Sequence, residues 1–599
     1  MITIRAVLAA AVTFACGWSA EADGLAERIR AARPVAVAVD PARSASLEAT
    51  IRWDGDLAGV SLRNAGNEPV AVREVVLFDL AHGLAADTPF YGEGLQMLAQ
   101  TAGTLGAPVD VGTYPDRSHY RLPEPDGFRR VYSLLTLEPR GAAQELIAFT
   151  TCRRFIGAFD VSATRLRATI DGEGIAIEPG ETWELENLML ARGPSRGDLL
   201  AELAREIAKV HPRTPWPSPP TGWCSWYCFG PRVTAKDVLD NLAAMRASFP
   251  DLEFVQVDDG YQPTMGDWLD TGPGFGGRPI GEILHEIRAG GREPAIWVAP
   301  FVASPDSRLL RERPELFIAD DGGKPLPSDR VMFGGWRLGP WSAIDGSDPA
   351  AQAWLAELFA TMRREWGVRY FKLDATFWGL MPGGKRHDPK ATRVEAFRRG
   401  MEAIRRGAGP DAYLLGCNQP MWPSLGLIDG SRSSLDIGRE WSSVASTGRE
   451  NLLRGWQNGT LWWNDPDAVV LTGLPEAEVR FHATLIHATG GAVLSGDDLS
   501  RLPESRTATL RMLSRPTGVA ARFDDQGLEV GRIPLGDGKT RYALLNWSGD
   551  AKGVKVTFDR AVKVRDVWSG IDLGTRSGET TFGPIVPHDA MLIETTPAD

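Results

Sequence analysis

The sequence predicts a multidomain protein of mixed α/β and β class. A central (β/α)8 TIM barrel is expected between an N-terminal β-sandwich and a C-terminal antiparallel β-sandwich. Three patterns predict this fold: short alternating segments in residues 21–215, a repeated strand and helix pattern in residues 216–504, and a return of short strands in residues 505–599. A chain of 599 residues is also too long for one hydrophobic core, so we expect several domains.

Residues 1–20 are expected to be a secretory signal peptide. A short basic start, Met1–Arg5, precedes the apolar run Ala6–Cys16. This pattern predicts a periplasmic or secreted protein. The sequence around Cys16 also faintly resembles a lipoprotein attachment site, which leaves a lipid anchor as an alternative. No later segment is apolar enough to predict a membrane span.

The N-terminal β-sandwich is predicted from alternating apolar and polar residues, for example in residues 50–55 and 71–77. A proline-rich stretch, residues 211–220, indicates a stiff linker and a domain boundary. In the C-terminal β-sandwich, Asp537-Gly538 is the turn signal of a hairpin between Ile533 and Tyr542.

Eight segments predict the strands of the barrel. Between them, Thr234 and Asp237 form a capping box that begins a helix. Asp388-Pro389 predicts the start of another helix, which closes at Gly407. The predicted strands are residues 221–229, 254–259, 293–302, 370–373, 412–417, 433–437, 468–471 and 492–494.

Charge and composition restrict the partners. The formal net charge is -12, and no Lys/Arg-rich stripe occurs, which argues against nucleic acid and favours a neutral or cationic partner. No pair of histidines has metal-ligand spacing, so the sequence predicts neither a metal nor another cofactor. Cys224 and Cys228 fall in one predicted strand, too far apart for a disulfide, and buried free thiols are expected.

Two predicted strands carry an aspartate at their end. Asp374 follows residues 370–373, and Asp436 lies at the end of residues 432–437. The carboxyl ends of barrel strands are where α/β enzymes build their active sites. Two such aspartates make a candidate nucleophile and acid for the cleavage of a glycosidic bond.

Other polar and aromatic residues at strand ends are expected to face the same pocket. Carboxylates suit sugar hydroxyls, and tryptophans suit the apolar faces of sugar rings. Each residue also has a structural alternative: a turn or half of a hard-cation site for Asp258-Asp259, an ion pair for Lys372 with Asp374, and core packing for the aromatic residues and Cys417. The strand-end residues are Trp226, Asp258, Asp259, Trp297, Lys372, Cys417, Asn418, Arg432, Asp497 and Asp498.

Several motifs between residues 221 and 502 resemble the clan of retaining α-galactosidases, glycoside hydrolase families 27 and 36. Residues 222–227, 257–261, 297–300 and 305–314 resemble family 36. Residues 432–441 and the run Trp463-Asn464-Asp465-Pro466-Asp467 resemble family 27. The layout of family 36, a barrel between two β-sandwiches, agrees with the predicted fold.

The resemblance implies roles for individual residues. Asp374 takes the place of the nucleophile and Asp436 that of the acid/base. Asp258 and Asp259 match the pair that binds the 4- and 6-hydroxyls, so a sugar without these partners would leave two carboxylates unpaired, and α-glucosides should be rejected. The other implied substrate contacts are Trp226, Trp297, Arg337, Lys372, Cys417, Asn418 and Arg432.

The implied function is an exported retaining exo-glycosidase that hydrolyses terminal α-galactosides. Lys372 is expected to keep Asp374 ionised, while a less compensated Asp436 retains its proton. Ala299 and Asn418 stand where relatives have Glu, and Asn418 would face the 2-position of the sugar. This leaves an α-N-acetylgalactosaminidase, a β-L-arabinopyranosidase and a transglycosylase of the same clan as alternatives. A non-catalytic carbohydrate-binding protein is the alternative from another class.

Overall fold

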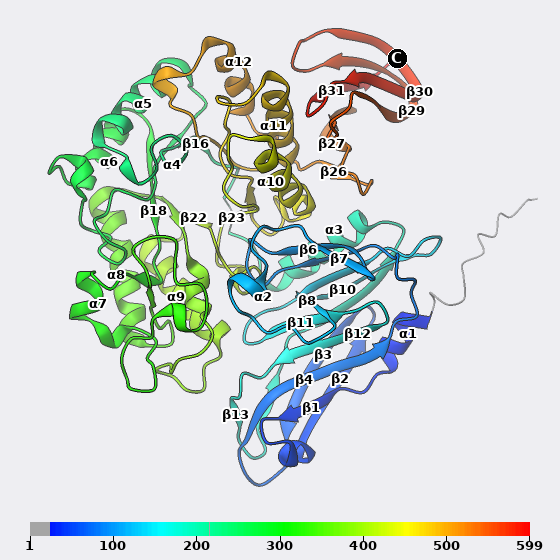
Figure 1. Cartoon of the computed structure of the whole chain (residues 1–599), viewed down its shortest axis with the longest axis vertical. Helices are drawn as coiled ribbons and strands as arrows, with labels where there is room; N and C mark the ends of the chain where they lie inside the picture. Colours follow the sequence, from blue (N-terminus) through cyan, green and yellow to red (C-terminus); the bar gives the residue numbers. More distant parts are fainter. Residues whose placement is uncertain (1–23, 215, 599) are drawn as a thin grey trace, which may run out of the picture.

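The computed structural model describes residues 24–214 and 216–598. The expected signal peptide, with Cys16, lies outside the described residues. The chain forms three regions, coloured blue to cyan, green to yellow and orange to red in Figure 1. Within the described residues, no helix is long and apolar enough to cross a membrane.

The N-terminal region contains two antiparallel sheets. They share one buried apolar core, to which Leu77 and Phe159 of the first sheet and Leu62 and Ile147 of the second contribute. The first sheet has the order β1 (Val35–Ala38), β4 (Val70–Ala81), β12 (Arg165–Asp171), β11 (Ile156–Val161) and β8 (Arg129–Tyr132), with β13 (Ala176–Ile177) also paired to β4. The second has the order β14 (Thr182–Glu184), β3 (Leu57–Asn64), β15 (Leu188–Gly193), β10 (Gln144–Phe149), β9 (Leu134–Leu137), β5 (Phe90–Glu93), β6 (Gln100–Thr104) and β7 (Ala107–Asp110), with β2 (Leu47–Asp54) paired to β3.

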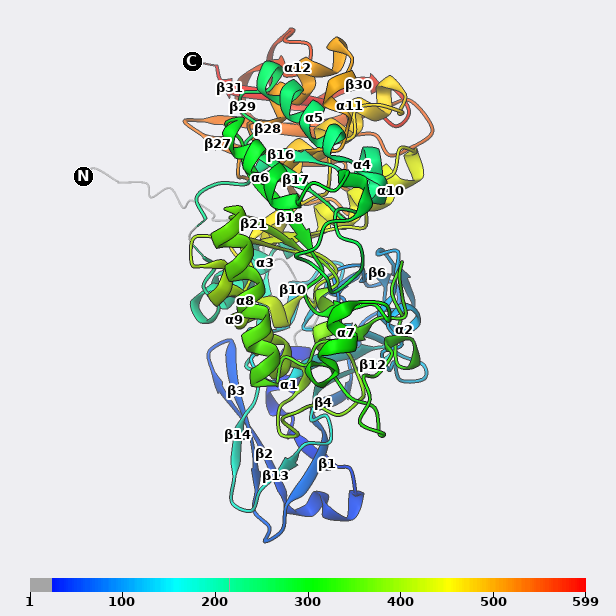
Figure 2. The same ribbon diagram turned by 90° about the vertical axis from the view of Figure 1, so that its left-hand side faces the viewer.

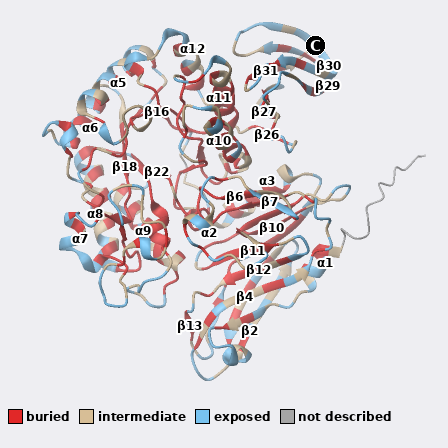
Figure 3. Cartoon of the chain, viewed as in Figure 1, coloured by how far each residue is buried: buried red, intermediate tan, exposed pale blue. Residues whose placement is uncertain are grey.

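The central region is an eight-stranded parallel sheet that fits a TIM barrel. An isolated parallel bridge between Val469 and Ser495 nearly closes it. Helices pack around the strands and turn their exposed faces outward (Figures 2 and 3). The order is β24 (Trp463–Asp465), β23 (Gly430–Arg432), β22 (Tyr413–Gly416), β21 (Tyr370–Leu373), β18 (Glu293–Val298), β17 (Phe254–Val257), β16 (Thr221–Cys224) and β25 (Val493–Ser495).

Three of the predicted barrel strands are misplaced. The strand predicted at residues 221–229 ends at Cys224, and the chain turns into the short helix α4 (Trp226–Phe229), so Cys224 and Cys228 do not share a strand. The strand predicted at residues 433–437 is β23, which ends earlier, at Arg432. Residues 468–471 provide only the bridge at Val469, because the preceding run, Trp463–Asp465, forms the strand instead.

The two predicted helix starts differ in outcome. The capping box of Thr234 and Asp237 begins α5 (Ala235–Ser248), as predicted. The helix predicted from Asp388 begins later, as α9 (Arg393–Ala408). Thr392 and Glu395 form the capping box there, and two reciprocal hydrogen bonds satisfy more of the free backbone N–H groups than a lone N-cap does. The predicted start was therefore wrong.

The C-terminal region forms one six-stranded antiparallel sheet. The predicted hairpin is present: β27 (Val530–Gly536) pairs with β28 (Lys539–Leu545) across Asp537 and Gly538. Both turn residues have positive φ, at 49° and 73°, as a two-residue hairpin turn requires. The order of strands is β26 (Arg522–Phe523), β27, β28, β31 (Ala590–Pro597), β29 (Lys552–Asp566) and β30 (Asp572–Ile585).

A fully buried ion pair joins the N-terminal region to the barrel. Arg454 Nη2 lies 2.7 Å from Glu93 Oε2, and neither side chain is exposed to solvent. The remaining guanidinium hydrogens are donated to the backbone oxygens of Met97, Ala99 and Ser433. Every nitrogen of Arg454 is therefore engaged, and one side chain links the segment after β5 to the loop after β23.

Removing one partner of this pair should destabilise the protein strongly. We expect Glu93→Ala to cost about 3–5 kcal/mol, because it leaves a buried guanidinium uncompensated. Replacing both partners, Glu93→Leu with Arg454→Met, should cost less than Glu93→Ala alone. The measurement is the midpoint of chemical denaturation. Lys236→Ala, which removes an exposed ion pair with Asp240, is the control and should leave the midpoint unchanged. A Glu93→Ala midpoint equal to that of the control would contradict the structural role of the pair.

Candidate active site

The carboxyl ends of the barrel strands open into a cavity of about 260 Å³. Of the catalytic residues and substrate contacts that the resemblance implied, all except Arg337 and Arg432 line this cavity. Those two arginines bind carboxylates of its wall. The lining residues predicted from the sequence are Trp226, Asp258, Asp259, Trp297, Lys372, Asp374, Cys417, Asn418 and Asp436. Asp497 and Asp498 are not among the lining residues.

Asp374 follows β21 directly and is held by three N–H donors. Its carboxylate accepts hydrogen bonds from Trp297 Nε1 at 2.9 Å, from Asn418 Nδ2 at 2.7 Å and from the backbone N of Ala375 at 2.7 Å. Ala375 and Asn418 both have left-handed backbone conformations, with φ of 51° and 44°. Such conformations are costly for residues other than glycine. Here they occur just beyond the ends of β21 and β22, where both residues donate to the carboxylate of Asp374.

Lys372 has a different partner from the one predicted. Its Nζ lies 2.9 Å from Asp258 Oδ2, whereas no ion pair joins Lys372 to Asp374 among the described residues. Burial alone would lower the pKa of Lys372, but Asp258 and other neighbouring groups together outweigh it, and the pKa lies well above its ordinary value. The lysine points away from the expected partner because a buried ammonium needs an opposite charge in direct contact, and Asp258 supplies it.

Asp258 and Asp259 are already paired within the protein. Asp258 accepts hydrogen bonds from Lys372, Gln256 and the backbone N of Asp259. Asp259 forms a bidentate ion pair with Arg337, with Nε to Oδ2 at 2.6 Å, and accepts from Gln262 at 2.7 Å. Burial raises the pKa of Asp259, and Arg337 opposes this rise.

The ion pairs of Asp258 and Asp259 change the reason for which the protein is expected to select galactosides over glucosides. A missing sugar hydroxyl would not leave either carboxylate unpaired, because Lys372 and Arg337 remain in contact with them. The sequence-based argument for strong rejection of glucosides was therefore wrong in its premise. Each carboxylate oxygen can still accept a further hydrogen bond from a sugar hydroxyl. The preference for galactosides over glucosides is then worth the free energy of one such hydrogen bond.

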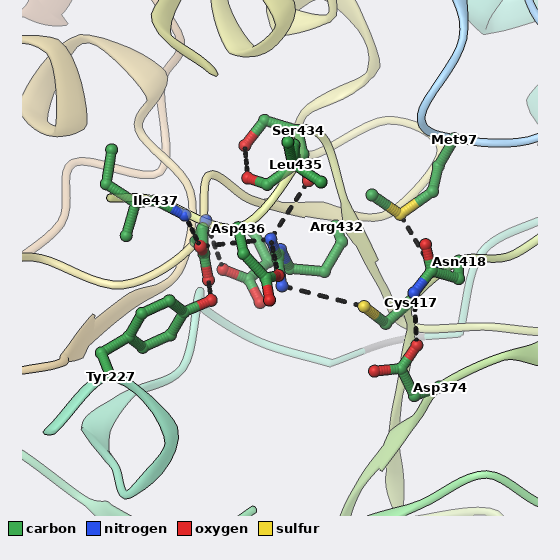
Figure 4. Close-up of polar contacts among 12 residues, drawn as sticks. Met97, Tyr227, Asp374, Cys417, Asn418, Arg432, Ser434, Leu435, Asp436 and Ile437 are labelled. Atoms are coloured by element: carbon green, nitrogen blue, oxygen red, sulfur yellow. Dashed lines mark hydrogen bonds and ion pairs between the residues drawn. The ribbon is translucent and has the colours of Figure 1, made fainter. Parts of the chain in front are cut away.

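Asp436 lies on the loop after β23, four residues beyond Arg432. Figure 4 shows its carboxylate beside the Arg432 guanidinium, at 3.1 Å from Nη2, and the same guanidinium reaches Cys417 Sγ at 3.7 Å. Desolvation alone would raise the pKa of Asp436, but Arg432 and Lys372 outweigh it and the net pKa is lowered. The expectation that Asp436 is the less compensated aspartate was wrong, since Arg432 compensates it directly.

Asp467 shares the same guanidinium. Its Oδ2 lies 3.2 Å from Arg432 Nη2 and accepts from the backbone N of Ile437 at 2.7 Å, while Oδ1 accepts from the hydroxyl of Tyr227. Burial, together with the neighbouring carboxylates of Asp436 and Asp465, outweighs the opposing effect of Arg432 and raises the pKa of Asp467 to about 6. Two interacting carboxylates on one cation titrate as a pair, so Asp467 influences the proton on Asp436.

The N-terminal region supplies one wall of the cavity that the sequence did not predict. Its lining residues are Met97, Leu98, Tyr114, His119 and Tyr120. Phe333, Trp336 and Leu435 of the barrel were also missed. No local pattern marks these residues, because they reach the site through contacts between distant parts of the chain. Asp467 could have been found, since it closes the Trp463–Asp467 motif.

The cysteines agree with the expected free thiols. Cys152, Cys224, Cys228 and Cys417 are all unpaired, and all except the half-buried Cys228 are buried. Burial raises the pKa of Cys417 well above its ordinary value, so this wall residue is a neutral thiol. Among residues 24–214 and 216–598, no group of His, Cys, Asp and Glu is arranged to hold a metal ion.

The chain resembles α-galactosidases in sequence and in fold. It is 25% identical to an α-galactosidase of Oryza sativa subsp. japonica over 260 residues, which cover 39% of this chain and 58% of that protein. The chain thus matches less than two thirds of the length of the first curated relatives. No protein-family model matches it.

Solved structures extend the likeness over most of the chain. An α-galactosidase from Thermus thermophilus, in complex with p-nitrophenyl α-D-galactopyranoside, superposes with a TM-score of 0.62 at 24% identity, over 82% of this chain and 98% of that one. A family 36 α-galactosidase variant from Geobacillus stearothermophilus gives 0.65 at 12% identity, over 92% and 82%. The comparisons therefore confirm the resemblance to the α-galactosidase clan that the motifs predicted.

Proposed function

We propose that the protein is an exported retaining exo-glycosidase that hydrolyses terminal α-galactosides. One observation carries the proposal: Asp374, held by Trp297 and Asn418, and Asp436, bound to Arg432, line a single cavity at the carboxyl ends of barrel strands. The homologues of the chain, which are α-galactosidases, support the choice of sugar. The apolar start of the sequence supports export.

The chemistry proceeds by double displacement in this proposal. Asp374 attacks the anomeric carbon, the bond to the leaving oxygen breaks, and Asp436 transfers its proton to that oxygen. In the second step Asp436 takes a proton from water as the water oxygen attacks the same carbon, and the ester to Asp374 breaks. Two inversions return the original configuration, and both carboxyl groups regain their initial states.

Protonation separates the two roles through Asp467. No cation of the described residues contacts Asp374, which is held by neutral N–H donors, so its oxygen remains available to attack. Asp436 must begin protonated, although Arg432 favours its ionised form. Asp467, the second carboxylate on Arg432, opposes that effect. Asp436 and Asp467 titrate as a pair, and at any pH below the higher of their two apparent pKa values the pair holds one proton. The active form is thus expected at mildly acidic pH.

The proposed function predicts activity on a panel of aryl glycosides. Aryl α-galactoside should be the preferred substrate, with the α-glucoside slower by roughly tenfold, the effect of one hydroxyl contact. Proton NMR of the first-formed product should show the α-anomer. Preference for the 2-acetamido sugar or for a β-L-arabinopyranoside would assign the corresponding alternative. Dominant transfer to added sugars would indicate a transglycosylase, and inactivity on every glycoside would reject hydrolysis.

Loss of the nucleophile should abolish turnover. Asp374→Ala is expected to lower kcat for aryl α-galactoside by at least about a thousandfold, because no other group can form the covalent intermediate. Added azide should restore consumption of the substrate and give the β-galactosyl azide. The control is Asp306→Ala, at an exposed aspartate outside the cavity, which should retain wild-type activity. A fair fraction of wild-type activity in Asp374→Ala without azide would exclude this residue as the nucleophile.

Asp467 should set the upper limit of the pH range. In the wild type, kcat/KM for a disaccharide should fall as the pH rises above about 6, where the pair loses its proton. Asp467→Asn removes the negative charge beside Asp436. The positive charge of Arg432 then acts on Asp436 without a competing carboxylate, so the pKa of Asp436 falls further. The alkaline limb should therefore move to lower pH, with a severalfold loss at neutral pH.

Two variants control this pH experiment. Asp436→Ala should lose the alkaline limb when assayed with a dinitrophenyl galactoside, whose departure needs little protonation. Asp411→Asn, at the opposite end of the barrel, should leave the profile unchanged. A limb that stays in place or moves to higher pH in Asp467→Asn would show that Asp467 does not influence the proton on Asp436.

A further inference from the structure

The outer part of the cavity is formed by four aromatic side chains, here named the aromatic collar: Tyr114, His119, Phe333 and Trp336. Tyr114 and Trp336 are 37% and 38% exposed, whereas the Asp374 side of the cavity is buried, so the collar lies toward the solvent. Tyr114 and His119 come from the N-terminal region, at the start and end of the segment that carries α2 (Asp116–His119). Phe333 and Trp336 come from a barrel loop.

The rings of the collar support one another. The centroid of the His119 ring lies 4.4 Å from that of Tyr114 and 4.3 Å from that of Phe333. The interplanar angles are 31° and 34°. Trp336 packs edge to face on Trp341 at 4.6 Å. These contacts fix the rings before any ligand binds, which reduces the ordering cost of binding.

The collar carries no charge near neutral pH. Burial lowers the pKa of His119 to about 4, so its imidazole is neutral. The charged groups of the cavity lie deeper and are paired within the protein, as Asp258 is with Lys372 and Asp259 with Arg337. An outer site of uncharged ring faces suits a ligand with a flat apolar face and offers no ion-pair partner to a charged one.

We propose that the aromatic collar is the subsite for the leaving group, and that it binds an uncharged six-membered ring with a flat apolar face. The ring can belong to an aryl group or to a second pyranose. The inference rests on the proposed function: if the sugar to be cleaved binds between Asp374 and Asp436, its leaving group extends toward solvent and meets the collar. Part of the substrate selection then resides in the N-terminal region.

The test compares substrates that differ only in the leaving group. Tyr114→Ala and Trp336→Ala are assayed on p-nitrophenyl α-galactoside, on an α-1,6-linked galactosyl glucose and on α-galactosyl fluoride, which has no ring to bind. The expected result is a loss of kcat/KM of roughly tenfold on the ring-bearing substrates and less than about twofold on the fluoride. Inhibition by free galactose should be unchanged.

Leu338→Ala is the matched control. Leu338 lies in the same loop as Trp336, is 44% exposed and does not line the cavity. It should behave as the wild type on all three substrates. A loss confined to the aryl substrate assigns an aryl leaving group, and a loss confined to the disaccharide assigns a sugar. An equal loss on the fluoride, or none on either ring-bearing substrate, would overturn the proposal.

The design separates failure of the collar from failure of the proposed function. If the wild type cleaves another glycone better than α-galactose, the proposed function is wrong. The same leaving-group pairs on that glycone then test the collar. If the wild type cleaves no glycoside, the collar is tested by binding instead. Calorimetry then compares the affinities for p-nitrophenyl α-galactoside and methyl α-galactoside. A preference for the aryl ligand that disappears in Tyr114→Ala and Trp336→Ala supports the collar, and equal binding of the two ligands overturns it.

Discussion

The site depends on the buried pairing of Glu93 with Arg454. A guanidinium without solvent contact is costly unless its hydrogens have acceptors, and for Arg454 the backbone oxygens of Met97, Ala99 and Ser433 complete the set. These oxygens belong to two walls of the cavity, because Met97 lines one side and Ser433 begins the loop that carries Asp436. The side chain of Arg454 therefore fixes the distance between the N-terminal region and the loop that carries Asp436.

A second cation, Arg432, holds two carboxylates of the site together. It contacts both Asp436 and Asp467, whereas the hydrogen bonds to Asp374 from the described part of the chain all come from N–H donors. The sequence suggested the opposite distribution of charge, because Lys372 is two residues from Asp374. Residues at positions i and i+2 of a strand share a face, yet Lys372 extends across to Asp258, which directly follows β17, where a buried ammonium gains a direct partner. Spacing along one strand predicts which face a residue lies on but does not identify its partner.

Much of the barrel could be predicted from the sequence, because buried parallel strands are short apolar runs between helix signals. Residues 370–373 and 412–417 were correctly assigned for that reason. The strand at Gly430–Arg432 was displaced, since its small and polar residues carry no apolar run, and the apolar Leu435 and Ile437 lie in the loop beyond it. Asp374 and Asp436, which line the cavity, were found because they belong to motifs. The wall around Tyr114 and His119 has no such motif and depends on contacts more than 200 residues apart in the chain, including those of His119 with Phe333.

The division of the cavity between two regions has a consequence for how its specificity can change. The carboxylates and their cations are all held by barrel strands and the loops that follow them, and their mutual pairing makes each costly to alter. Tyr114 and Trp336 are partly exposed, carry no charge and pack against other rings. Substitutions among them can reshape the outer site without leaving a buried charge unpaired. Under the proposed function, the barrel constrains the bond that is attacked, while the collar is free to vary with the group that leaves.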